Sequence, residues 1–166
     1  MKNQLEFIKD QKENCITVIR TFNAPVDKVW RAWTEPALLD QWWAPRPWMT
    51  KTKSMDFREG GFWLYSMQGP EGEEHFCRAD YKKIVTGKSY NALDAFCDEN
   101  GTPTEFPNMN WTNTFIPNSD GSSTVNILIK YKDAETMEKV IEMGFKEGFT
   151  SAMENLDEIF ESTTSV

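Results

Sequence analysis

At 166 residues the chain has the length of a single domain, and its 39% hydrophobic and 27% charged residues are typical of a folded globular protein rather than a disordered one. The net charge of −8 argues against nucleic acid or an anionic membrane surface as partner, because phosphates require clustered Lys and Arg. The charged N-terminal segment MKNQLEFIKDQKEN lacks the apolar core of a signal peptide, so we expect a cytoplasmic protein.

The first predicted elements are a strand and two short helices. Residues 15–22 (CITVIRTF) alternate in hydrophobicity and are rich in β-branched residues, which favours a strand. Pro25 suits the first position of a helix, and Pro36 marks the start of a second one. Apolar residues at helical spacing follow each proline: Val26, Val29, Trp30 and Trp33, then Leu38, Leu39, Trp42 and Trp43.

From Met49 the period changes to two, and turn residues separate six further strands. The predicted strands are at about 49–57, 61–68, 74–84, 88–97, 109–116 and 123–131. The short connections between them favour an antiparallel meander, with residues 99–108 as its one longer loop. We expect the strand at 15–22 to pair with the edges of this meander, so that the sheet curls.

The last segment, residues 134–160, has a helical period and a wide apolar stripe, which predicts one long helix. Gly144 and Gly148 lie on this stripe, where each costs about 1 kcal/mol relative to alanine in a helix interior. They indicate either close backbone packing against the sheet or space that is left for a ligand.

The predicted fold class is therefore α+β, with a curved antiparallel sheet of about seven strands wrapped on a long C-terminal helix and two short helices after the first strand. We expect one domain at residues 15–160, preceded by an N-terminal extension at 1–14 and followed by a tail at 161–166. A curled sheet and a long helix do not fill the space between them completely, which favours a pocket there.

Three segments of the sequence resemble a known family. They are FNAPVDKVWRAWTEPALLDQWWAP at 22–45, DFREGGFWLYSMQGPEG at 56–72, and the strand end at 81–84, YKKI. The chain resembles the activator of heat-shock-protein-90 ATPase homologue-like family, within the START/Bet v 1-like (SRPBCC) superfamily, over residues 15–160. The spacing of glycine, aromatic and leucine residues in the last helix fits the same family.

The resemblance implies a helix-grip fold. It also implies a choice of functions, because the superfamily includes binders of lipids, polyketides, flavonoids and antibiotics, some cyclases and hydrolases, and a co-chaperone domain. The chain lacks the additional N-terminal domain of the eukaryotic co-chaperone, which argues against a chaperone partner. Our leading hypothesis is a hydrophobic small-molecule binder, as a monomer or homodimer.

The sequence offers no complete catalytic set, and we assign it no catalytic residue, metal or cofactor. His75 is the single histidine, so neither a zinc site nor a triad with Ser66 or Cys77 is indicated by spacing. The three cysteines form no CxxC pair and are expected to be reduced. Asp94 interrupts an apolar strand: it is either a solvated outward residue or, facing inward, a base or hydrogen-bond acceptor with a raised pKa.

Aromatic residues are the better indication of a site, because aromatic walls with a few polar groups describe a ligand pocket as well as a core. If one face of the strands is concave, it meets the last helix in a closed cavity, although a slip by one residue would reverse the faces. An enzyme would need His75, Asp94 or another carboxylate in that cavity, whereas an interaction protein would expose Trp42, Trp43 and Trp48. The predicted ligand-binding residues are Trp63, Tyr65, Met67, Asp94, Trp111, Asn113, Phe115, Phe145, Phe149 and Met153.

Overall fold

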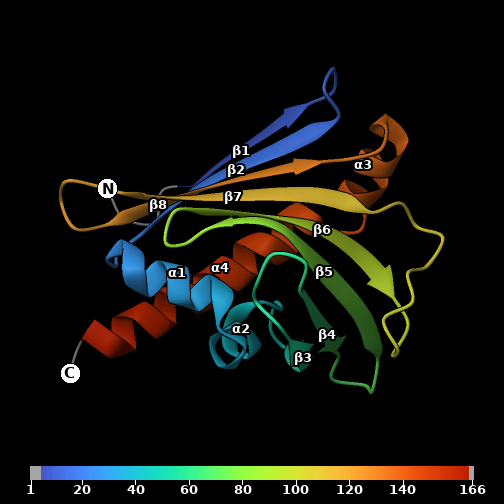
Figure 1. The fold of residues 1–166 in the computed structure, drawn as a ribbon, viewed down its shortest axis with the longest axis horizontal. Coiled ribbons are helices and arrows are strands. Elements are labelled where there is room, and N and C mark those ends of the chain that lie inside the picture. The colour runs from blue at the N-terminus through green and yellow to red at the C-terminus, as the bar shows by residue number, and fades with distance from the viewer. Residues whose placement is uncertain (1–4, 165–166) are drawn as a thin grey trace.

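The computed structural model describes residues 5–164 and confirms the α+β class: one curved antiparallel sheet wraps around a C-terminal helix (Figure 1). The strands are β1 (Leu5–Asp10), β2 (Cys15–Phe22), β3 (Met49–Met55), β4 (Phe62–Gln68), β5 (Glu74–Val85), β6 (Ser89–Cys97), β7 (Met109–Pro117) and β8 (Ser123–Lys130). The helices are α1 (Val26–Thr34), α2 (Pro36–Trp42), α3 (Ala134–Glu142) and α4 (Phe145–Thr164).

The eight strands lie in the order β1-β2-β8-β7-β6-β5-β4-β3. The meander from β3 to β8 is as predicted, and β2 pairs with its last strand, with Val18 opposite Ile127. The expectation that this strand would pair with both edges of the meander is wrong, because β1 and β3 form the two edges of an open sheet.

The sheet has one strand more than the predicted seven. Residues 5–10, which we assigned to an N-terminal extension, form β1 and pair with β2. Half-buried Leu5 and Phe7 pack against the core, whereas their neighbours Glu6 and Ile8 are exposed. Two inward side chains are too short a pattern to predict a strand from sequence, and pairing with β2 supplies the remaining stabilisation.

The C-terminal segment is two helices instead of the one long helix predicted. Gly144 adopts a φ of +89°, a left-handed conformation that ends α3 and that side-chain-bearing residues rarely adopt. Its backbone N–H donates to the carbonyl of Ile141 at 3.0 Å, and α4 begins at the next residue. The helical period of the sequence runs through this break because both helices pack against the same core.

Helix α4 is attached to the sheet and to the segment after α2 by polar contacts. Arg20 on β2 is 4% exposed and forms an ion pair with Asp157 of α4. Asn155 of α4 donates its Nδ2 hydrogen to the carbonyl of Ala44 at 3.1 Å. This second contact fixes the segment after α2 relative to α4, and that segment forms one wall of the cavities described below.

The core is a single hydrophobic cluster, rich in aromatic rings, between the concave face of the sheet and the helices. Trp33 and Trp42, on the predicted stripes of α1 and α2, are 1% and 0% exposed, with ring centroids 4.9 Å apart. The indole N–H of Trp42 donates to the carbonyl of Ala32 at 2.9 Å, which joins the two short helices. Within residues 5–164, no helix has the length and apolar character needed to cross a membrane.

Candidate ligand-binding cavity

Three adjoining cavities run from the surface into the core between the sheet and helices α3 and α4. The outer cavity has a volume of about 780 Å³, the inner cavity about 220 Å³, and a deep recess about 20 Å³. The outer and inner cavities share Pro45, Met67, Cys77, Phe96 and Met143. The inner cavity and the recess share Trp43, Tyr65, Asp94 and Trp111. We refer to these three adjoining spaces together as the channel.

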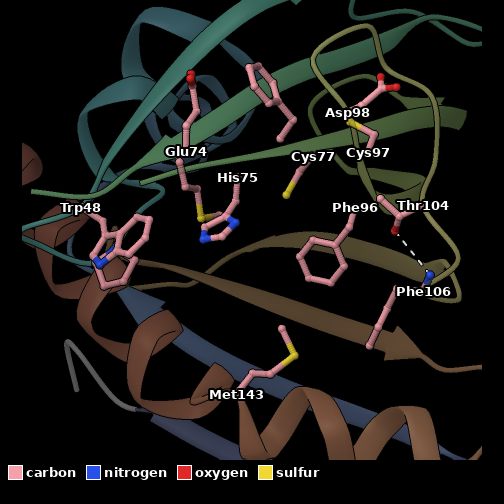
Figure 2. Close-up of a pocket in the computed structure, with 13 residues that line it drawn as sticks. Trp48, Glu74, His75, Cys77, Phe96, Cys97, Asp98, Thr104, Phe106 and Met143 are labelled. Atoms are coloured by element: carbon pink, nitrogen blue, oxygen red, sulfur yellow. Dashed lines mark hydrogen bonds between the residues drawn. The ribbon is translucent and has the colours of Figure 1, made fainter. Parts of the chain in front are cut away.

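The outer cavity is open to solvent, since Glu74, His75 and Asp98 on its wall are exposed. Its apolar walls are also visible in Figure 2, where Met143 lies across the cavity from His75. The ring of Trp48 stacks on His75, with centroids 5.6 Å apart. The prediction of a closed cavity is therefore wrong, because the outer cavity is open at the surface.

Four aromatic rings from four separate segments form the walls of the inner cavity. Trp43 directly follows α2, Tyr65 lies on β4, Trp111 on β7 and Phe149 on α4. The centroid of Trp43 is 5.9 Å from those of both Trp111 and Phe149, and Trp111 is 5.7 Å from Phe149. The indole N–H of Trp43 donates to the Tyr65 hydroxyl at 3.1 Å, which fixes both rings.

Asp94 faces inward from β6 and lines both the inner cavity and the recess. Its burial raises the pKa of the carboxyl to about 7, with a smaller contribution from the negative charge of Asp80. The backbone N–H of Ala95 acts in the opposite direction. Among the described residues, no Lys or Arg forms an ion pair with Asp94. The carboxyl thus lies in an apolar cavity without a counter-charge.

Three further polar atoms on the cavity walls lack a hydrogen-bond partner within the described part of the chain. They are the indole N–H of Trp111, the hydroxyl of Tyr131 and the side-chain oxygen of Asn113. All three residues are at most 8% exposed, and an unpaired buried polar group costs about 1–3 kcal/mol. Trp111 and Tyr131 line the inner cavity, where a guest molecule would satisfy both.

The structure brings most of the predicted ligand-binding residues to one place. Those that line the inner cavity are Tyr65, Met67, Asp94, Trp111, Phe145 and Phe149. Trp63 and Asn113 line the recess. Phe115 and Met153 line none of the three cavities: they are 4% and 1% exposed and belong to the core.

Sequence reasoning missed several cavity residues. Phe96 lies two residues after Asp94 on β6 and Met109 two before Trp111 on β7, so both follow from strand alternation once the inward face is known. Tyr131 continues the buried alternation of Val125, Ile127 and Ile129 one step beyond the end of β8. Trp43 belongs to the apolar stripe predicted for the second helix, which indicates burial but not a place on the cavity wall. Its position there depends on how the chain leaves α2.

The titratable groups around the cavity do not assemble a nucleophile. Burial raises the pKa of the Cys77 thiol, as does the neighbouring charge of Asp94, so the thiol stays protonated at neutral pH. His75 is exposed and stacks on Trp48 instead of reaching Cys77. Cys15, Cys77 and Cys97 are free and buried. Between residues 5 and 164, no group of three or more His, Cys, Asp or Glu residues is placed to hold a metal ion.

The three tryptophans that an interaction protein would expose are buried or half-buried. Trp42 is completely buried, and Trp43 and Trp48 are half-buried on the walls of the inner and outer cavities. The three residues therefore do not form an exposed apolar patch.

Comparison with known proteins gives a family match over most of the chain. The model of the family described as Activator of Hsp90 ATPase homolog 1-like protein matches residues 23–161. Comparison with curated proteins found no match.

Solved structures from several bacteria are similar to the chain over nearly its full length. Protein Ms6760 from Mycobacterium smegmatis is 27% identical with a TM-score of 0.87, over 96% of this chain and 99% of that one. A protein from Arthrobacter aurescens is 27% identical with a TM-score of 0.88, over 95% and 91%. Protein NE0264 from Nitrosomonas europaea is 27% identical with a TM-score of 0.80, over 93% and 98%. None of these three names states a ligand or an activity.

Proposed function

The chain belongs to the Activator of Hsp90 ATPase homolog 1-like protein family, and on this premise we propose that it binds an apolar or aromatic small molecule between the sheet and α4. The superfamily's fold commonly binds hydrophobic ligands, as the sequence resemblance implied. The ligand class that best fits walls made of indole and phenyl rings is a flat one, such as a polyketide or a flavonoid-like molecule, with lipids as a further candidate.

The observation that carries this proposal is the set of adjoining cavities whose inner walls bear unpaired polar atoms. The outer cavity alone, at about 780 Å³, falls within the range of roughly 300–1,000 Å³ that small-molecule pockets occupy. The inner cavity combines aromatic walls with the unpaired Trp111 N–H and Tyr131 hydroxyl. A packed core would have filled the inner cavity with side chains. A ligand that fills it would also form hydrogen bonds with the Trp111 N–H and the Tyr131 hydroxyl.

Asp94 favours a second candidate function, acid–base catalysis in the same cavity. A carboxyl whose pKa is raised to about 7 exchanges a proton near neutral pH, as a general base or acid must. A cyclase or hydrolase of this kind would obtain most of its rate enhancement from positioning the substrate. Binding alone needs no such chemistry and remains the leading proposal.

Tryptophan fluorescence titration tests the proposal, because Trp43 and Trp111 both line the inner cavity. We expect saturable quenching at micromolar concentrations by at least one member of a panel of fatty acids, flavonoids and polyketides. Trp111→Ala and Phe149→Ala should abolish the response while circular dichroism shows an intact fold. Phe106→Ala serves as the matched control and should weaken binding less, because Phe106 lines the outer cavity and not the inner one. An absence of quenching across the panel would contradict the proposal.

A further inference from the structure

The charged groups along the channel are of one sign. Glu74 and Asp98 line the outer cavity, and Asp94 lines the inner cavity and the recess. None of the described residues that line the three cavities is a lysine or an arginine. A ligand carboxylate or phosphate would therefore enter without a counter-ion and approach three carboxyl groups. The protein's net charge of −8 adds to this repulsion and attracts cations instead.

Aromatic residues line the same spaces as Asp94 at the inner end of the channel. Trp43, Tyr65 and Trp111 line both spaces that Asp94 lines. The faces of such rings carry negative electrostatic potential and attract organic cations, most strongly where water is excluded. Isolated buried charges are unfavourable, and Asp94 has no cationic partner among the described residues. Aromatic faces and one unpaired carboxylate together form a receptor for an ammonium group.

We propose that the ligand is an amphipathic organic cation, with an apolar or aromatic body held by the cavity walls and an ammonium group bound by the Asp94 carboxylate. The proposal rests on the proposed binding function and names the class of ligand. The unpaired hydroxyl oxygen of Tyr131 can accept a second hydrogen bond from the same ammonium group. The unpaired indole N–H of Trp111 cannot accept one and is left for a neutral acceptor, such as an ether or carbonyl oxygen, on the ligand body.

The protonation of Asp94 gives this binding a definite pH dependence. The charged neighbour of Asp94 is Asp80 on β5, which forms an ion pair with Arg78. The tyrosine and cysteine groups around it are Tyr65 on β4, Cys77 and Tyr81 on β5, Tyr90 on β6, and Tyr131 after β8. Burial raises the pKa of each of these five groups, so all remain neutral from pH 5 to pH 8. Asp94 is then the group that changes charge at the inner end of the channel, and it is ionised above a pKa of about 7.

Calorimetric titration with three probes of one skeleton tests the proposal: 4-phenylbutylammonium, 4-phenylbutanol and 4-phenylbutanoate. At pH 8 we expect the ammonium to bind about tenfold or more tightly than the alcohol, and the carboxylate more weakly than the alcohol. At pH 5 the advantage of the ammonium should disappear, because Asp94 is protonated. At pH 7 its binding should release protons, measured by comparing buffers of different ionisation enthalpy, whereas a neutral ligand that accepts a hydrogen bond from protonated Asp94 would take protons up.

Variants separate Asp94 from the general negative charge. Asp94→Asn should remove the preference for the ammonium at pH 8 and leave the affinity for the alcohol nearly unchanged. Glu74→Gln removes one charge from the outer cavity, and its preference should stay within about twofold of that of the unmodified protein. His75→Gln should keep the pH dependence, since His75 lies on the outer cavity.

The outcomes distinguish this proposal from the binding function on which it rests. If the alcohol binds and the ammonium binds no more tightly at pH 8, or if the carboxylate binds best, the ammonium proposal is overturned and the binding function stands. An equal loss of preference in Glu74→Gln and Asp94→Asn would also overturn it. If none of the three probes binds at millimolar concentration, the ammonium proposal is overturned, and the fluorescence panel alone decides the binding function.

Discussion

The two ends of the space inside the sheet differ in how they are filled. At the filled end, Phe22 and Phe160 are at most 5% exposed, and their rings meet edge to face at 5.9 Å. At the open end, Asp94 and Phe145 are half-buried along a channel that reaches the surface. The same curved sheet supports both ends. In this protein, tight packing between the sheet and α4 at one end therefore coexists with an unfilled space at the other.

Large-to-small substitutions at the two ends should show the largest difference in stability. Phe22→Ala at the filled end should cost about 3–5 kcal/mol, because it removes a completely buried ring and leaves a void. Phe145→Ala at the open end should cost about 1 kcal/mol, because its half-buried ring already borders a cavity. Urea denaturation of both variants measures the two costs. Equal costs would break the distinction between a filled end and an open end.

Asp94→Asn tests the energetic cost of the carboxyl at the open end. The folded-state pKa of about 7 lies above the ordinary value of 3.8, so between these pH values the folded protein binds a proton that the unfolded chain has lost. This carboxyl therefore destabilises the fold progressively as pH rises from about 4 to about 7.

The Asp94→Asn variant should be similar in stability to the unmodified protein at pH 4. At pH 8 it should be more stable by up to about 4 kcal/mol, because the pKa rises from 3.8 to about 7 and each unit corresponds to roughly 1.4 kcal/mol. Denaturation of both proteins over this pH range measures the difference, from which the effects of the other carboxyl groups cancel. A difference that does not grow with pH would show that Asp94 is solvated, contrary to its place in the cavity.

Gly144 and Gly148 provide the smallest and most specific contrast, since both line the inner cavity. Gly144→Ala should destabilise the protein by about 1–2 kcal/mol, because its φ of +89° is unfavourable for a residue with a Cβ atom. A Cβ atom at Gly148 would lie 3.6 Å from Cγ of Pro45, an ordinary contact.

Gly148→Ala should therefore stabilise α4 by up to about 1 kcal/mol while it narrows the cavity and weakens ligand binding. Thermal unfolding and fluorescence titration measure the two effects separately. If Gly148→Ala leaves binding unchanged, the ligand does not occupy the space beside α4. If both glycine variants gain stability, the left-handed conformation of Gly144 is contradicted.

The sequence by itself determined the class of fold and nearly every element of it. Strand alternation and helical stripes are local consequences of burying one face, so β2 to β8, α1 and α2 follow from residue order, and the family follows from motifs such as those at 22–45 and 56–72. The inward set of Trp63, Tyr65 and Met67 likewise follows from a period of two. Assigning these three residues to the inward face required only the knowledge of which face of the sheet is concave.

Only the tertiary structure decided whether those inward residues form a core or a cavity. Phe115 and Phe149 are equally apolar, yet one packs among core rings and the other borders open space, because α3 and α4 break at Gly144 and the segment after α2 brings Trp43 opposite Trp111. The side on which Asp94 lies depended on which face of the sheet is concave. Packing depends on contacts between segments distant in sequence, and a local pattern does not contain the volume that those contacts leave unfilled.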